Sequence, residues 1–181
     1  MINNYNFGER LSFHNSWIKV IAEKIPKVLP KLTELKYVQT QEIGISFTCV
    51  YKTGKVDVKI RNDNGKKDFY PKTIVLETYS DVDRRVRGWT YTTGSDYVVQ
   101  CWEFNNQLMP IAFIIDMKRL RESDFFKSIE VVYPTRWAQS NGGRWFTQFR
   151  APNYEDFPPN IVTKFSFEKE KKTRIGDVRD L

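Results

Sequence analysis

The stretch Val56-Asp-Val-Lys-Ile-Arg61 decides how the middle of this 181-residue chain is interpreted. Side chains of a β-strand alternate between two faces, so Asp57, Lys59 and Arg61 would share one face. The apolar residues would share the other: Val56, Val58 and Ile60. The alternation predicts a strand with one face in a core, and it places a carboxylate and an ammonium two residues apart on a rigid element.

Hydrophobic periodicity predicts a helix near the N-terminus. Apolar residues recur at three- and four-residue steps over 8–32, with Ser12 as the expected N-cap. Pro26 and Pro30 interrupt the pattern, and proline removes a backbone donor. The helix is therefore expected to end or kink near Lys24.

Short runs rich in β-branched and aromatic residues predict a series of strands. The expected strands are Gly44–Tyr51, Val56–Arg61, Lys72–Tyr79, Trp89–Tyr91, Ser95–Trp102, Pro110–Ile115, Glu130–Tyr133 and Arg144–Phe149. Asp116 is expected to cap a helix over Met117–Phe126. This order predicts an α+β fold with an N-terminal helix and a central mixed or antiparallel sheet flanked by helices. Residues 1–167 are expected to form one domain, and 168–181 a charged, flexible tail.

Composition limits the partners of this chain. The net charge of +7 and the pI of about 9.3 favour polyanions, with nucleic acid first. Trp137 and Trp145 are interpreted as core residues, with base stacking as the alternative. Cys49 and Cys101 match no zinc or disulfide spacing, so two buried thiols are expected. The longest apolar run, 109–115, is too short to span a bilayer, so we expect a cytoplasmic protein without a membrane partner.

A second acidic residue follows in the next predicted strand. The run Thr73-Ile-Val-Leu-Glu77 is apolar on both faces before its terminal acid. A buried carboxylate costs free energy unless it is paired or bound to a cation. Asp57, Lys59 and Glu77 on neighbouring strands are groups that can hold a divalent metal ion and act on phosphodiesters. The same alternation is typical of any half-exposed antiparallel strand, so a purely structural role stays open.

The polar connection after this strand is basic. It carries three arginines: Arg84, Arg85 and Arg87. Arginine binds phosphate oxygens through paired donors, so these residues and Arg61 are candidate nucleic-acid contacts. The alternative is a solvated charged loop. The dipeptide Gly88-Trp89 predicts a close approach of two chain segments that packs the indole in the core.

Five segments follow one another at characteristic spacing within residues 39–120. They are Gln41-Glu-Ile-Gly-Ile-Ser46, Val56-Asp-Val-Lys-Ile-Arg61, Ile74-Val-Leu-Glu77, Gly88-Trp89 and Ser95-Asp-Tyr-Val-Val99. Their order resembles the PD-(D/E)xK nuclease superfamily, and more narrowly its small phage-encoded members. The resemblance implies a restriction-endonuclease-like core. It also implies that Asp57 and Glu77 hold Mg²⁺ or Mn²⁺ while Lys59 assists hydrolysis of DNA phosphodiesters.

The chain departs from that pattern at one position. The superfamily places an upstream acid near Ser46, which cannot supply a carboxylate. Glu42 or Glu77 would supply the missing ligand, or else Asp57 is the upstream acid and Tyr79 takes the lysine position. The alternative function is therefore a nuclease-like module that binds DNA or a host protein without enzymatic activity. In either case the resemblance implies a phage protein acting in the host cytoplasm; an interaction module with no nucleic-acid role is a third interpretation.

Overall fold

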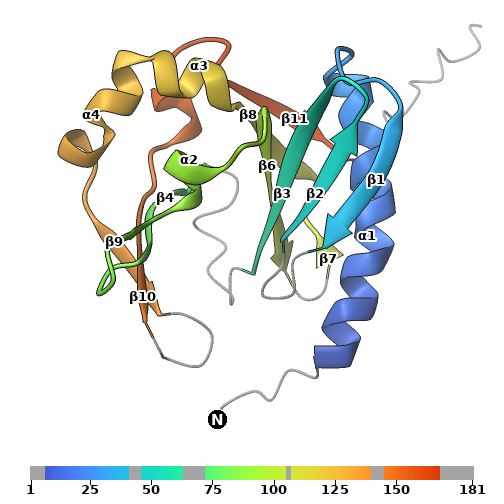
Figure 1. Ribbon diagram of the computed structural model, residues 1–181, viewed down its shortest axis with the longest axis horizontal. Coiled ribbons are helices and arrows are strands. Elements are labelled where there is room, and N and C mark those ends of the chain that lie inside the picture. The colour runs from blue at the N-terminus through green and yellow to red at the C-terminus, as the bar shows by residue number, and fades with distance from the viewer. Residues whose placement is uncertain (1–6, 41–45, 63–71, 105–106, 140–144, 168–181) are drawn as a thin grey trace, which may run out of the picture.

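The computed structural model describes residues 7–40, 46–62, 72–104, 107–139 and 145–167 as a mixed α+β fold (Figure 1). Its helices are α1 (Phe7–Val28), α2 (Trp89–Thr92), α3 (Met117–Glu122) and α4 (Asp124–Val132), with a 3-10 helix at Tyr154–Asp156. Its strands are β1 (Leu35–Thr40), β2 (Ser46–Tyr51), β3 (Gly54–Asn62), β4 (Leu76–Asp81), β5 (Val86–Arg87), β6 (Tyr97–Phe104), β7 (Gln107–Leu108), β8 (Ile111–Asp116), β9 (Arg136–Gln139), β10 (Phe146–Arg150) and β11 (Val162–Ser166). Glu42 and the predicted tail 168–181 lie outside the described ranges.

The strands form a larger and a smaller sheet. The larger sheet has the order β1-β2-β3-β6-β8-β11, with β7 paired to β6. In it β3 and β6 run parallel and the other neighbours antiparallel. The smaller sheet has the order β5-β4-β10-β9 and is antiparallel. The predicted α+β class, with an N-terminal helix and a mixed sheet, is confirmed.

The larger sheet separates two cores. The first lies against α1 and includes Ile21, Ile25, Val56, Val58 and Ile60. The second lies against α3 and α4 and includes Ile74, Leu76, Phe113, Leu120 and Ile129. Figure 1 shows α1 on one side of the molecule and α3, α4 and the smaller sheet on the other. Cys49 and Cys101 are buried free thiols of the first core, as predicted. In the described ranges no helix combines the length and apolar character needed to cross a bilayer.

Helix α1 continues past its predicted end near Lys24, with Pro26 in its last turn. Proline lacks the N–H that would bond the carbonyl four residues earlier, here that of Ala22. The Tyr51 hydroxyl on β2 donates to this carbonyl oxygen at 2.9 Å. The helix does not end near Lys24, because a side chain distant in sequence replaces the missing donor.

Other local predictions are also wrong. Residues 89–91 form α2 rather than a strand, and 130–133 form the end of α4 and its C-cap. The helix predicted over 117–126 divides in two because Ser123 is extended, and its hydroxyl caps α4 by accepting from Phe126 N–H. Ser12 lies inside α1. The β-branched residues near 131 favour a strand only weakly, and helical packing of α4 outweighs that preference.

One buried side chain joins the smaller sheet to the larger. Gln100 on β6 is 1% exposed. Its Oε1 accepts from the Val75 N–H at 3.0 Å, and its Nε2 donates to the Val75 carbonyl. One amide thus satisfies both backbone groups of a buried residue that precedes β4. This contact fixes where β4 begins relative to β6.

Replacement of Gln100 tests that role. Gln100→Leu would leave the Val75 N–H and C=O buried without partners, so we expect the free energy of unfolding to fall by about 2–5 kcal/mol. Urea denaturation measures the change. The matched control is Gln39→Leu on β1, where the side chain is exposed. Equal midpoints for the two variants would show that Gln100 does not join the sheets.

Candidate functional site

The charged face of β3 points away from α1, because the apolar residues that alternate with Asp57, Lys59 and Arg61 lie in the first core. Glu77 lies on β4 of the smaller sheet. The prediction that Asp57 and Glu77 occupy neighbouring strands is therefore wrong, since β6 takes the place beside β3. The fold nevertheless brings Glu77 within electrostatic reach of Lys59 and Arg61.

Hydroxyl groups from three residues on two segments hold Asp57, which is 8% exposed. Thr48, its partner in the β2–β3 register, donates to Oδ1 at 2.7 Å, and Thr93 donates to Oδ2 at 2.6 Å. Ser95 donates as well. Burial would raise the pKa of Asp57, but these hydrogen bonds and the charge of Lys59 outweigh it and lower the pKa below its ordinary value.

Glu77 is half-buried, and its Oε1 accepts from the backbone N–H of Trp89 at 3.2 Å. Burial raises the pKa of Glu77 above its ordinary value. The Trp89 N–H and the charges of Lys59 and Arg61 offset only part of that rise. Glu77 thus faces two cations while holding its proton more tightly than an ordinary glutamate.

Gly88 lets the chain pass close to Glu77. A Cβ at position 88 would lie 2.3 Å from the Glu77 carbonyl oxygen and 2.7 Å from its Cγ. The backbone of Gly88 is extended, with φ −75° and ψ 170°, so the missing side chain is the requirement here. The predicted close approach is confirmed, and its partner is Glu77. The Trp89 ring packs at the border of the second core.

Lys59 and Arg61 give this face its positive charge. The charge of Lys59 helps to lower the pKa of Asp57 and offsets part of the rise in the pKa of Glu77. The ammonium therefore lies within electrostatic reach of both carboxylates. The Arg61 guanidinium lies 5.7 Å from the centroid of the Phe149 ring on β10, a cation–π distance. Phe149 is the register partner of Glu77. The cations of the larger sheet therefore face an acid and an aromatic ring of the smaller one.

The other predicted arginines have local partners. Arg87 forms an ion pair with Glu130 at 3.0 Å and lies 4.6 Å from the ring centroids of Tyr79 and Tyr91. Arg84 lies 3.7 Å from Asp81, three residues earlier. Arg85 occupies the β4–β5 turn with a φ of 55°. Among the four predicted arginines, Arg61 is the one whose charge acts on Glu77.

Three hydroxyl residues that hold Asp57 were missed by sequence reasoning: Thr48, Thr93 and Ser95. The tight β2–β3 hairpin pairs Tyr51 with Gly54, and counting back from it would have found Thr48 opposite Asp57. Nothing in the sequence signals Thr93 or Ser95. The same register pairs Ser46 with Lys59.

The donor set fits a metal ion poorly. Both oxygens of Asp57 already accept hydroxyl protons, which stabilise its charge as a cation would. Glu77 lies on the other sheet and has a raised pKa. Within the described ranges no three carboxylate, imidazole or thiol groups are placed to hold a metal ion. Asp57 and Glu77 are still the two residues that the sequence predicts as metal ligands.

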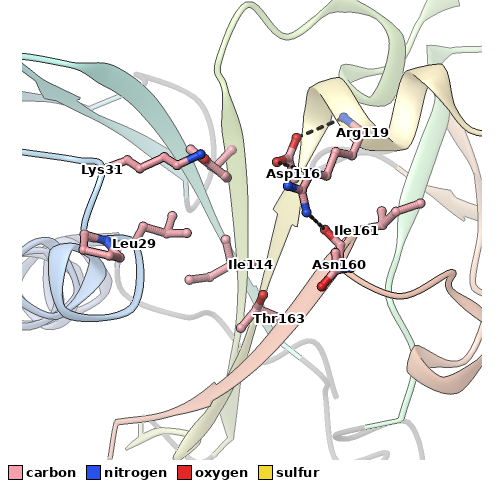
Figure 2. Close-up of a pocket in the computed structure, with 10 residues that line it drawn as sticks. Leu29, Lys31, Ile114, Asp116, Arg119, Asn160, Ile161 and Thr163 are labelled. Atoms are coloured by element: carbon pink, nitrogen blue, oxygen red, sulfur yellow. Dashed lines mark hydrogen bonds and ion pairs between the residues drawn. The ribbon is translucent and has the colours of Figure 1, made fainter.

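A cavity of about 200 Å³ lies elsewhere, beside the first core (Figure 2). Apolar side chains of Leu29 and Ile114 line it together with the side chain of Lys31. Arg119 closes one side, 3.6 Å from Asp116 and donating to the Asn160 carbonyl at 3.1 Å. None of the predicted site residues lines this cavity.

Comparisons with protein-family models, curated proteins and solved structures match nothing to this chain. The fold class shown by the structure is α+β with a mostly antiparallel sheet. The resemblance to the PD-(D/E)xK superfamily stays a prediction based on the sequence segments that carry it.

The close approach at Gly88 yields one prediction. Gly88→Ala forces the new Cβ against the Glu77 backbone, so we expect the free energy of unfolding to fall by about 1–3 kcal/mol. Gly94→Ala is the matched control, because nothing lies within 4 Å of a Cβ there. Its effect should stay within about 0.5 kcal/mol. Indistinguishable urea midpoints would contradict the assigned contact.

The hydroxyl cage of Asp57 predicts a pH dependence. A carboxylate with a lowered pKa in the folded state stabilises the protein above its unfolded pKa, ordinarily near 3.8. This contribution disappears as the pH falls through the lower folded value. We expect Asp57→Asn to be less stable than the wild type at pH 7 and the difference to shrink below pH 3.8. Denaturation at pH values from 7 to 2.5 measures this difference in stability. Asp83→Asn, at an exposed position, is the control. A difference between wild type and Asp57→Asn that does not change with pH would contradict the hydrogen bonds assigned to Asp57.

Proposed function

We propose that this chain binds nucleic acid, with DNA as the first candidate, through contacts of Lys59 and Arg61 with backbone phosphates. One observation carries the proposal: Lys59 and Arg61 lie two residues apart on the charged face of β3, and both act on the half-buried Glu77. Asp57 on the same face accepts hydrogen bonds from neutral hydroxyl groups. Two neighbouring cations on one strand can contact successive phosphates of a nucleic-acid backbone.

The chemistry of the two cations supports a phosphate partner. Arginine presents a planar fork of donors that matches phosphate oxygens, and lysine adds a mobile point charge. The net charge of +7 attracts polyanions over longer range. Phe149, beneath Arg61, provides an aromatic surface at the same place. These features favour binding to the backbone, which depends on charge more than on base sequence.

We also propose that the α+β fold of this chain has a restriction-endonuclease-like core. An N-terminal helix against one face of a mixed sheet, and an acid and a lysine on one strand, support it. The placement of Glu77 on a second sheet departs from that arrangement.

Hydrolysis of phosphodiesters is the second candidate function. The observation in its favour is that Lys59 acts on both carboxylates, Asp57 and Glu77. In this candidate the two acids would hold Mg²⁺ or Mn²⁺, which would supply charge to activate water and the phosphate. Lys59 would stabilise negative charge on the reacting phosphate. We rank it second because the hydroxyl donors already occupy Asp57.

Removal of Lys59 tests the binding proposal. We expect Lys59→Met to weaken binding of a fluorescent DNA duplex and to lower the salt slope of log K by about one. Fluorescence anisotropy from low to high NaCl measures both. Lys164→Met, at an exposed position of β11, is the control with the same loss of charge. Equal affinities and slopes for the two variants would overturn the assigned face.

Glu77→Gln separates the two candidate functions in the same assay. If the face only binds, removing this carboxylate takes away repulsion, and DNA binding should become tighter. If the face hydrolyses, plasmid cleavage by the wild type in Mg²⁺ or Mn²⁺ should stop in EDTA and in Glu77→Gln. Tight binding without cleavage in either metal would eliminate hydrolysis and leave binding.

A further inference from the structure

The β9–β10 hairpin exposes two large aromatic side chains. Trp137 on β9 is 55% exposed, and Phe146 on β10 is 47% exposed. Single exposed apolar residues are normal on a folded protein, but adjoining aromatic rings mark an interaction surface more often. The prediction that Trp137 is a core residue is wrong, because β9 lies at the edge of the smaller sheet and not beneath a helix.

The register places both rings on one face of the hairpin. Trp137 pairs with Gln148, and Gln139 pairs with Phe146. These pairs are two residues apart, so all four side chains share a face, and Trp137 and Phe146 occupy diagonal positions, whose backbones are about 7–8 Å apart in such a pair. The two glutamines add amide donors and acceptors beside the rings. This arrangement of the four side chains is here called the aromatic face.

Cationic side chains lie on the other face of the same hairpin. That face carries Phe149, over which Arg61 lies at 5.7 Å. Arg136 pairs with Phe149 in the β9–β10 register and so shares that face. In the described ranges β9 is the outermost strand of the smaller sheet. Figure 1 shows the hairpin projecting away from α4.

We propose that the aromatic face stacks the unpaired bases of single-stranded nucleic acid. The proposal rests on the proposed function, since Lys59 and Arg61 hold the phosphates while Trp137 and Phe146 hold bases. The backbone passes β9, the outermost strand of the smaller sheet, to connect the two faces. Base stacking on aromatic rings is tolerant of sequence, and a cationic surface tracks the backbone beside it. Duplex DNA keeps its bases stacked internally and cannot use the rings.

Charge favours this occupant over a second copy of the chain. Two copies that each carry +7 repel one another, whereas a nucleic-acid strand is attracted. The aromatic face is therefore assigned to bases, and self-association is the competing outcome of the test.

The experiment compares three probes in fluorescence anisotropy: oligo(dT) of about 12 nucleotides, an abasic strand of equal length and charge, and a duplex. We expect the wild type to prefer oligo(dT) to the abasic strand. Trp137→Ser and Phe146→Ser should each weaken oligo(dT) binding about fivefold or more and leave duplex binding unchanged. Tyr37→Ser, on β1 at the same 55% exposure as Trp137, is the matched control and should change nothing.

The outcomes distinguish this proposal from the one on which it rests. If Lys59→Met weakens all three probes while Trp137→Ser weakens none, phosphate binding stands and the stacking proposal is overturned. If the wild type binds none of the probes, both fail. Sedimentation of the same variants tests self-association. If the wild type is a dimer and Trp137→Ser dissociates it without affecting oligo(dT) binding, the stacking proposal is overturned. The aromatic face is then an interface between copies of the chain.

Discussion

The contact between the Gln100 amide and the backbone of Val75 determines how the two sheets meet. Gln100 is the register partner of Lys59 in the parallel pair of β3 and β6, so both side chains share a face. Val75 is held on that face by two hydrogen bonds, and Glu77 follows two residues later. The docking of one buried backbone segment thereby brings the acid of the smaller sheet to the cations of the larger. Glu77 reaches the charged face of β3 because a polar side chain satisfies the backbone of the residue that precedes β4.

Asp57 and Glu77 offset the free-energy cost of burying a carboxylate in different ways. Asp57 is the more buried, and neutral hydroxyl donors keep it charged. Glu77 has one backbone donor and two nearby cations, and burial still raises its pKa. Hydroxyl donors thus keep one carboxylate charged, whereas the other relies on a backbone donor and on cations of the neighbouring sheet.

Several features of the site were predictable from local pattern. Period-two alternation placed Asp57, Lys59 and Arg61 together, and Gly88 marked a close approach that is made to Glu77. The end of α1 was not predictable, because the donor that replaces the missing N–H of Pro26 comes from Tyr51. The hydrogen bonds from Thr93 and Ser95 were equally hidden, since these residues reach Asp57 only after β6 pairs with β3.

The sequence by itself determined the strand Val56–Arg61, its two faces, the α+β class and the excess of positive charge, because each follows from local periodicity or composition. Tertiary structure alone decided that β6 lies beside β3, that Glu77 belongs to a second sheet, and that Trp137 is exposed. Pairing between strands and burial depend on contacts between residues far apart in the chain, and the free energies of alternative pairings differ little at the level of the single strand.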